Sequence, residues 1–214
     1  MIVVCPTPSS PVWKDLLLAA PAVITALTAL AGVVVAKAGL DTWRRETVGK
    51  RKIELAEAVL ADFYEARDIL EAARSPGGFE DEGASRRRSP DETEEDTRKL
   101  DSYFRTIERL NSKSEFFALL HSRRYRFQAI FGRSAATSFD ELFRIRNEII
   151  VAGRMLMMFE RNGDIGSLPQ DRKSWLSTLG WSPDNDPIKP RLDQAVEAVE
   201  QICTPALTGA SASV

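Results

Sequence analysis

The longest apolar run of the chain lies near its start. Residues 16–36 contain no charged side chain, and charged residues stand on both sides of the run. At about 1.5 Å per residue, a helix of this length spans roughly the 30 Å hydrocarbon core of a bilayer. Trp13 and Trp43 flank the run, and an amphipathic indole ring suits the membrane–water interface. The pattern therefore predicts a transmembrane helix over residues 15–37.

Two other interpretations of this segment fit the sequence less well. A cleaved signal peptide has a basic leader and an apolar core of about 7–15 residues, whereas this leader carries a single Lys and the apolar run is longer. Ala36-Lys37-Ala38 is a small-x-small pattern of the kind that precedes cleavage, so this alternative stays open. A buried helix of a soluble protein rarely lacks charge over such a length.

Basic residues are concentrated on the C-terminal side of the predicted span. The N-terminal side offers only Lys14. The cations that follow the span are Lys37, Arg44, Arg45, Lys50, Arg51 and Lys52. By the positive-inside rule, residues 1–14 form a short extracytoplasmic tail and the C-terminal part is cytoplasmic, in a single-pass protein of the inner (plasma) membrane. The last five cations, here called the basic cluster, also suit contact with anionic headgroups, although setting the topology explains them more simply.

One face of the predicted span carries small residues. Thr28, Gly32 and Ala36 recur every four residues, which places them on the same side of a helix. Small side chains allow two membrane helices to approach closely. This face is a candidate for self-association, although alanine-rich spans also contain such spacings by chance.

A helical pattern continues after the span and then stops at a charged segment. Apolar residues recur at three and four positions through residues 38–74, which predicts a juxtamembrane amphipathic helix that ends before Ser75-Pro76-Gly77-Gly78. Residues 75–96 then alternate acidic clusters with three consecutive arginines and contain one aromatic residue. Such a composition buries too little apolar surface to offset its ordering entropy, so we predict a charged disordered linker.

The remaining sequence predicts a helical bundle over residues 97–204. One helical pattern begins at Thr97, and a second opens at Ser138, where Glu141 completes a capping-box pattern. Residues 163–190 have no clean period and are predicted to be irregular, whereas Pro190 starts a last short helix. Residues 205–214 are predicted to be a flexible tail. The predicted fold is all-α, with one N-terminal transmembrane helix continuing into a cytoplasmic up-and-down helical bundle.

Composition narrows the possible chemistry. The 29 Lys and Arg nearly balance the 31 Asp and Glu, so net charge gives no reason to expect nucleic-acid binding. One His and two Cys argue against a metal site and a disulfide scaffold. The sequence has no phosphate-binding loop, dinucleotide glycine pattern, zinc-protease motif or nucleophile elbow. We predict no cofactor and no metal, and we favour a non-enzymatic role.

Two basic elements keep a nucleic-acid alternative open. Residues 121–127 interleave arginines with aromatic residues, a composition also found on stacking and phosphate-binding surfaces. Arg146 and Asn147 resemble the start of the R-N-x-x-x-H signature of HEPN-domain ribonucleases, which are all-helical proteins. The histidine of that signature would fall at Val151, or at Ala152 or Gly153 with wider spacing, and none of these is histidine. The resemblance therefore implies a HEPN-like shape without the imidazole that the ribonuclease chemistry requires.

A wider resemblance covers most of the chain from residue 40 onward. The segments that carry it are Leu40–Glu46, Gly49–Glu57, Arg124–Ala129, Phe139–Leu142, Arg146–Ile149, Asp186–Arg191 and Glu200–Pro205. Together they resemble a group of uncharacterised bacterial single-span membrane proteins, which implies a membrane-anchored helical protein and no assigned activity. We therefore predict an interaction or scaffold module whose partners are the lipid bilayer and either a second copy or another protein. The alternative is a membrane-tethered HEPN-like RNA-binding protein or nuclease.

Overall fold

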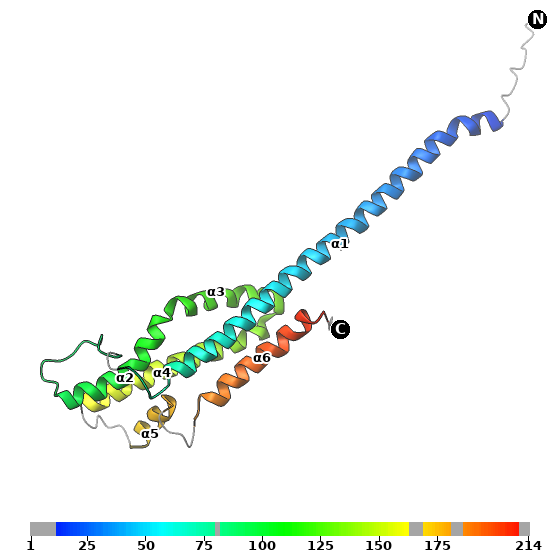
Figure 1. Cartoon of the computed structure of the whole chain (residues 1–214). Coiled ribbons are helices and arrows are strands. Elements are labelled where there is room, and N and C mark those ends of the chain that lie inside the picture. The colour runs from blue at the N-terminus through cyan, green and yellow to red at the C-terminus, as the bar shows by residue number, and fades with distance from the viewer. Residues whose placement is uncertain (1–11, 80–81, 163–168, 181–185, 210–214) are drawn as a thin grey trace, which may run out of the picture. The chain divides into compact units, whose positions relative to one another are not determined.

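The computed structural model consists of helices and turns in the part of the chain that it describes (Figure 1). The described residues are 12–79, 82–162, 169–180 and 186–209. The helices are α1 (Val12–Ala73), α2 (Glu94–Ser112), α3 (Ser114–Phe131), a short 3-10 helix η1 (Arg133–Ala136), α4 (Thr137–Asn162), α5 (Pro169–Thr178) and α6 (Lys189–Leu207). The prediction of an all-α protein with a long apolar N-terminal helix is confirmed.

The chain divides into two units, Met1–Arg51 and Lys52–Val214, and α1 contributes to both. Among the described residues, one helix is long and apolar enough to cross a membrane, and its apolar window has no buried residue. Residues 1–11 of the predicted extracytoplasmic tail and the side chain of Trp13 lie outside the described part of the chain, and α1 begins at Val12. The second unit is a helical bundle with a continuous apolar core.

Within the second unit, α1 contributes a stripe of buried residues to the core. Ala56, Val59, Phe63, Ala66 and Leu70 are fully buried. Their spacing of three and four residues follows from the helical period of 3.6 and places all five on one face. Ile53, which continues the spacing of three and four residues toward the N-terminus, is 41% exposed, because at about 100° per residue it lies about 100° from the centre of the stripe.

Aromatic side chains join three helices at the centre of the bundle. The rings of Phe63 and Phe139 meet edge to face with centroids 4.8 Å apart, and Phe127 lies 5.5 Å from Phe139. All three side chains are fully buried. Edge-to-face and tilted contacts of this kind add to the stabilisation from apolar burial. The hydrophobic period thus brings α1, α3 and α4 together.

Helix α4 packs against α2, α5 and α6. Gly153 allows the close approach of α2, because a Cβ atom there would lie 3.2 Å from the side chain of Ile107 and 3.4 Å from the carbonyl oxygen of Tyr103. The approach brings Tyr103 within 3.2 Å of Glu160, to which its hydroxyl donates a hydrogen bond.

Helix starts differ from the predictions at two places. Ser138 lies inside α4 rather than at its N-cap, because η1 leads directly into the helix at Thr137. A capping box forms instead at the start of α2, where the side chain of Thr93 accepts from the amide of Asp96 and the carboxylate of Asp96 accepts from the amide of Thr93. This box begins α2 inside the segment that composition assigned to a linker.

The C-terminal third contains more helix than the pattern predicts. Helix α5 lies within residues 163–190, which were predicted to be irregular, and α6 continues through Pro205 to Leu207. Arginine side chains satisfy the carbonyl groups that helix ends leave open. Arg74 donates to the carbonyl oxygens of Thr178 and Ser177 at the end of α5, and it also pairs with Asp186 at 2.6 Å.

Candidate functional site

The predicted packing face of the span is open in the structure. Apart from the neighbouring backbone of the helix, no atom of the described chain lies within 4 Å of the position that a Cβ atom of Gly32 would occupy, and Thr28 and Ala36 are exposed. The hydroxyl group of Thr28 donates to the carbonyl oxygen of Ile24 at 3.0 Å and to that of Thr25 at 2.9 Å. Because the hydroxyl is satisfied within its own helix, the face presents methyl groups and bare backbone to its surroundings.

Helix geometry separates one member of the basic cluster, Lys50, from the others. Arg44, Arg45 and Arg51 are exposed, and no carboxylate among the described residues pairs with them. At about 100° per residue, these three lie on one side of the helix and Lys50 lies on the other. Lys52 belongs to the second unit, where its ammonium lies 5.2 Å from the ring centre of Phe131.

Arg146 and Asn147 point in different directions. The guanidinium of Arg146 is half-buried and lies 4.8 Å from the ring centre of Phe117, and its Nε atom has no hydrogen-bond partner. Burial lowers the pKa of this guanidinium. Asn147 and Val151, the position of the HEPN histidine, are exposed on another side of α4.

The only histidine does not complete a catalytic pair with Arg146. His121 lies edge to face with Phe143 at 5.1 Å, and its Nε2 lies 3.3 Å from the hydroxyl of Tyr125. Neither neighbour is a carboxylate that would orient the imidazole for acid–base catalysis. The nuclease alternative therefore gains no support from the positions of Arg146 and Asn147.

Two arginines of the arginine-rich segment of α3 form ion pairs with carboxylates of other helices. Arg123 pairs with Asp62 of α1, and Arg124 pairs with Asp140 of α4 at 2.6 Å. Tyr125 is exposed, but two of its arginine neighbours are not free to contact phosphates. These contacts favour a structural role for residues 121–127 over a nucleic-acid surface.

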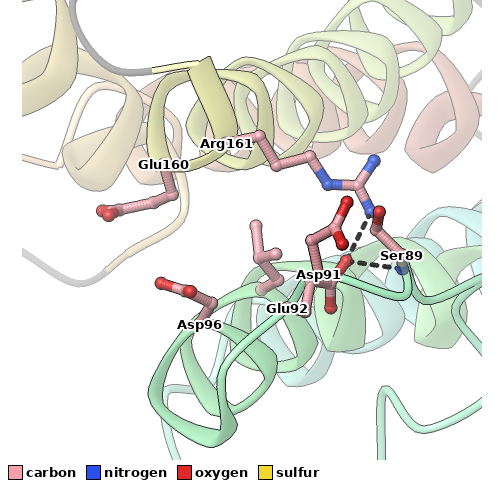
Figure 2. A pocket seen from close by; sticks show the side chains of 7 residues that line it. Ser89, Asp91, Glu92, Asp96, Glu160 and Arg161 are labelled. Carbon is pink, nitrogen blue, oxygen red and sulfur yellow. Dashed lines mark hydrogen bonds and ion pairs between the residues drawn. The ribbon is translucent and has the colours of Figure 1, made fainter.

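A cavity of about 320 Å³ lies between the segment before α2 and the end of α4. Figure 2 shows Arg161 of α4 reaching toward Glu92 and Ser89, with Glu160 and Asp96 on the other side. Glu92 is the centre of the contacts, because it accepts from Arg161 at 3.2 Å and from the amide of Ser89 at 3.0 Å.

Arg86 links the segment before α2, which contains Ser89 and Glu92, to α2 itself. Its guanidinium, 4% exposed, binds Glu92 at 2.6 Å and Asp101 at 2.9 Å. Hydrogen bonds from Arg86 and from the amide of Ser89 lower the pKa of Glu92 to about 2. The charge pairs of Arg86 thus attach the described part of residues 75–96 to α2, although most of its side chains are exposed.

This ion network was missed by the sequence reasoning. The one local signal was Thr93 followed three residues later by Asp96, which has the spacing of a capping box although its acid is Asp in place of Glu or Gln. The carboxylates of the network are engaged by arginines, and the described residues contain no group of three or more His, Cys, Asp or Glu that could hold a metal ion. We interpret the network as a structural latch.

Gly83 provides a test of the latch. Its φ is +89°, its amide donates to Glu108 at 2.6 Å, and a Cβ atom there would lie 2.9 Å from the carbonyl carbon of Asp101. We expect Gly83→Ala to lower the free energy of unfolding by more than the roughly 1–3 kcal/mol that backbone strain at a positive φ costs, because the clash with Asp101 adds to it. Gly132→Ala is the control, since Gly132 has φ +94° and no atom within 4 Å of its Cβ position. Thermal unfolding followed by circular dichroism measures both variants, and equal losses would contradict the predicted clash.

Comparisons with protein-family models, with curated proteins and with solved structures give no match to this chain. The assignment of a function therefore depends on the residues and contacts described above.

Proposed function

We propose that the chain is a single-pass membrane anchor for a helical interaction module. In this proposal residues 15–37 cross the inner membrane, the N-terminus lies outside, and the part after the span carries an up-and-down bundle in the cytoplasm. The observation that carries the proposal is the uncharged N-terminal part of α1, whose apolar window has no buried residue. Exposing so much apolar surface to water is unfavourable, whereas a bilayer covers it.

The bundle supports a binding role better than a catalytic one. Its charged side chains are largely engaged with one another, as in the pairs of Arg191 with Glu148 at 2.6 Å and of Lys189 with Glu71 at 3.1 Å. Such pairs fix the helices without presenting a reactive group. We therefore propose that the bundle presents a binding surface for a partner at the membrane.

The proposed mode of assembly is self-association through Thr28, Gly32 and Ala36. The larger side chains of the span, such as Val34, lie on the opposite side of the helix, about 160° from Gly32. Two copies can therefore approach through the small face while lipid covers the large one.

Amine cross-linking of the full chain in native membranes tests this proposal. Gly32→Leu fills the open face, and we expect the yield of cross-linked dimer to fall about tenfold, the change that a loss of roughly 1.4 kcal/mol produces. Val34→Leu adds bulk to the opposite side and should leave the yield unchanged. An unchanged yield for Gly32→Leu would exclude the small face, and a cross-link to another protein alone would replace the second copy with that partner.

A further inference from the structure

The first unit carries a basic face whose charges find no partner in the structure. Lys37, Arg44, Arg45 and Arg51 are exposed, and none of them pairs with a carboxylate of the described chain. Most arginines beyond residue 60 do have such a partner, including Arg74, which pairs with Asp186. The unpaired cations are thus concentrated in the stretch that follows the apolar run.

Helix geometry places these four cations together. Projected at about 100° per residue, Lys37, Arg44, Arg45 and Arg51 lie within an arc of about 120°. Val48 lies at the centre of this arc, and Asp41 is its one carboxylate, so the face keeps an excess of three positive charges. We call these four residues the basic face.

We propose that the basic face binds anionic phospholipid headgroups, with residues 39–51 of α1 lying down on the membrane surface. The proposal rests on the proposed membrane span. Charge complementarity and direct continuity with the apolar run argue for lipid as the occupant, because each basic residue near an anionic surface contributes about 1 kcal/mol. Val48 at the centre adds an apolar contact between the cations.

The basic face extends so far along α1 that all of it can reach the headgroups only if the helix tilts. A helix running straight along the bilayer normal would place Arg51 about 22 Å beyond Ala36. Electrostatic attraction falls off within a Debye length of about 8 Å at physiological salt, so Arg51 would then contribute nothing. The segment has to tilt for the whole basic face to reach the headgroups.

Two glycines allow this tilt. Gly39 and Gly49 lie inside the helix, and no atom lies within 4 Å of the position of a Cβ atom at either residue. Glycine in a helix interior costs about 1 kcal/mol relative to alanine, and no packing within the described chain requires it here. Low helix propensity at both ends of the basic face permits the bend that lipid contact needs.

Spin labels on the full chain test the proposal in nanodiscs. Cys5→Ser removes one thiol, and Cys203 is fully buried with its pKa raised to about 11 by burial, so it stays unlabelled. A label at Val48→Cys sits on the basic face, and a label at Thr42→Cys sits about 120° away but nearer the span. A nickel-chelating lipid reports which label lies closer to the membrane surface.

A helix that lies on the membrane surface and a helix that runs straight away from it predict opposite orders of nickel relaxation at the two labels. If the basic face binds lipid, discs containing phosphatidylglycerol should give several-fold stronger nickel relaxation at Val48→Cys than at Thr42→Cys. This order should reverse in phosphatidylcholine alone, where a straight helix keeps Thr42 nearer the surface. The triple variant R44Q/R45Q/R51Q should show the reversed order in both lipids.

A matched control removes the same charge elsewhere. Arg87, Arg126 and Arg154 are exposed and form no ion pair with a described carboxylate, so R87Q/R126Q/R154Q should keep the lipid response. The proposal is overturned if lipid charge does not change the order of the labels, or if Val48→Cys shows spin–spin broadening that places a second copy on this face. A chain that fails to enter the discs overturns the proposed span as well, and this failure is visible before any label is read.

Discussion

Replacing Phe63 with alanine should destabilise the bundle by about 3–5 kcal/mol, a large fraction of the stability of an ordinary domain. Phe63 is fully buried, and its ring contacts Phe139, which in turn lies 5.5 Å from Phe127. The substitution removes the apolar side chain that joins α1 to the other helices, and it leaves a cavity that packed neighbours cannot fill. Urea unfolding of the full chain in detergent, followed by circular dichroism, measures the loss.

Phe79 is the matched control for this prediction. Its side chain is 82% exposed, so Phe79→Ala should change the free energy of unfolding by no more than about 0.5 kcal/mol. Similar midpoints for the two variants would show that Phe63 does not hold the core together. A decrease confined to Phe63→Ala would support the arrangement of α1 against α3 and α4.

The features that sequence predicts well are those that depend on neighbouring residues. The apolar run needs no partner to be recognised, and the buried stripe from Ala56 to Leu70 follows from periodicity alone. Ile53 shows the limit of a spacing of three and four residues, because it continues that spacing but projects about 100° from the centre of the stripe and is exposed. Local pattern therefore predicts the elements more reliably than it predicts their burial.

The features that sequence misses depend on residues far apart in the chain. The spacing of four residues favours pairs of Arg144 with Asp140 and with Glu148. Arg144 pairs with Glu141 instead, and Arg191 of α6 takes Glu148 while also binding Glu141. Arg191 is 43 residues from Glu148 and 50 from Glu141 in the sequence, and only tertiary packing brings it to them, which no local rule predicts.

The same dependence on distant residues limits how much of the candidate sites could be predicted from the sequence. The absence of histidine at position 151 is visible in the sequence, whereas the contact of Arg146 with the ring of Phe117 depends on how α3 packs against α4. The prediction for residues 75–96 depends on the composition of the whole segment, which hides the contribution of any single residue. Composition does not show that Arg86 binds Glu92 and Asp101, which offset the cost of burying its charge.

Removing Arg86 should therefore have the second large effect. Arg86→Met leaves the side chains of Glu92 and Asp101, which are 8% and 15% exposed, without their main partner. Breaking a buried pair in this way costs about 3–5 kcal/mol. Arg88→Met is the control, because Arg88 contacts the same Asp101 at 3.0 Å from a half-exposed position, and exposed pairs are worth about 0–1 kcal/mol.

The effect of Arg86→Met should also depend on pH in a defined direction. Hydrogen bonds, of which the one from Arg86 has the largest effect and the one from the amide of Ser89 the next, lower the pKa of Glu92 from 4.5 to about 2 in the folded chain. A lowered carboxyl pKa stabilises the fold above the unfolded value, and this stabilisation is lost as pH falls through the folded value. The difference in unfolding free energy between the wild type and Arg86→Met should thus be largest near neutral pH and shrink between pH 4.5 and about 2. Urea midpoints measured across this range test the sign, and a difference that stays constant with pH would mean that Arg86 stabilises the latch by packing rather than by its charge.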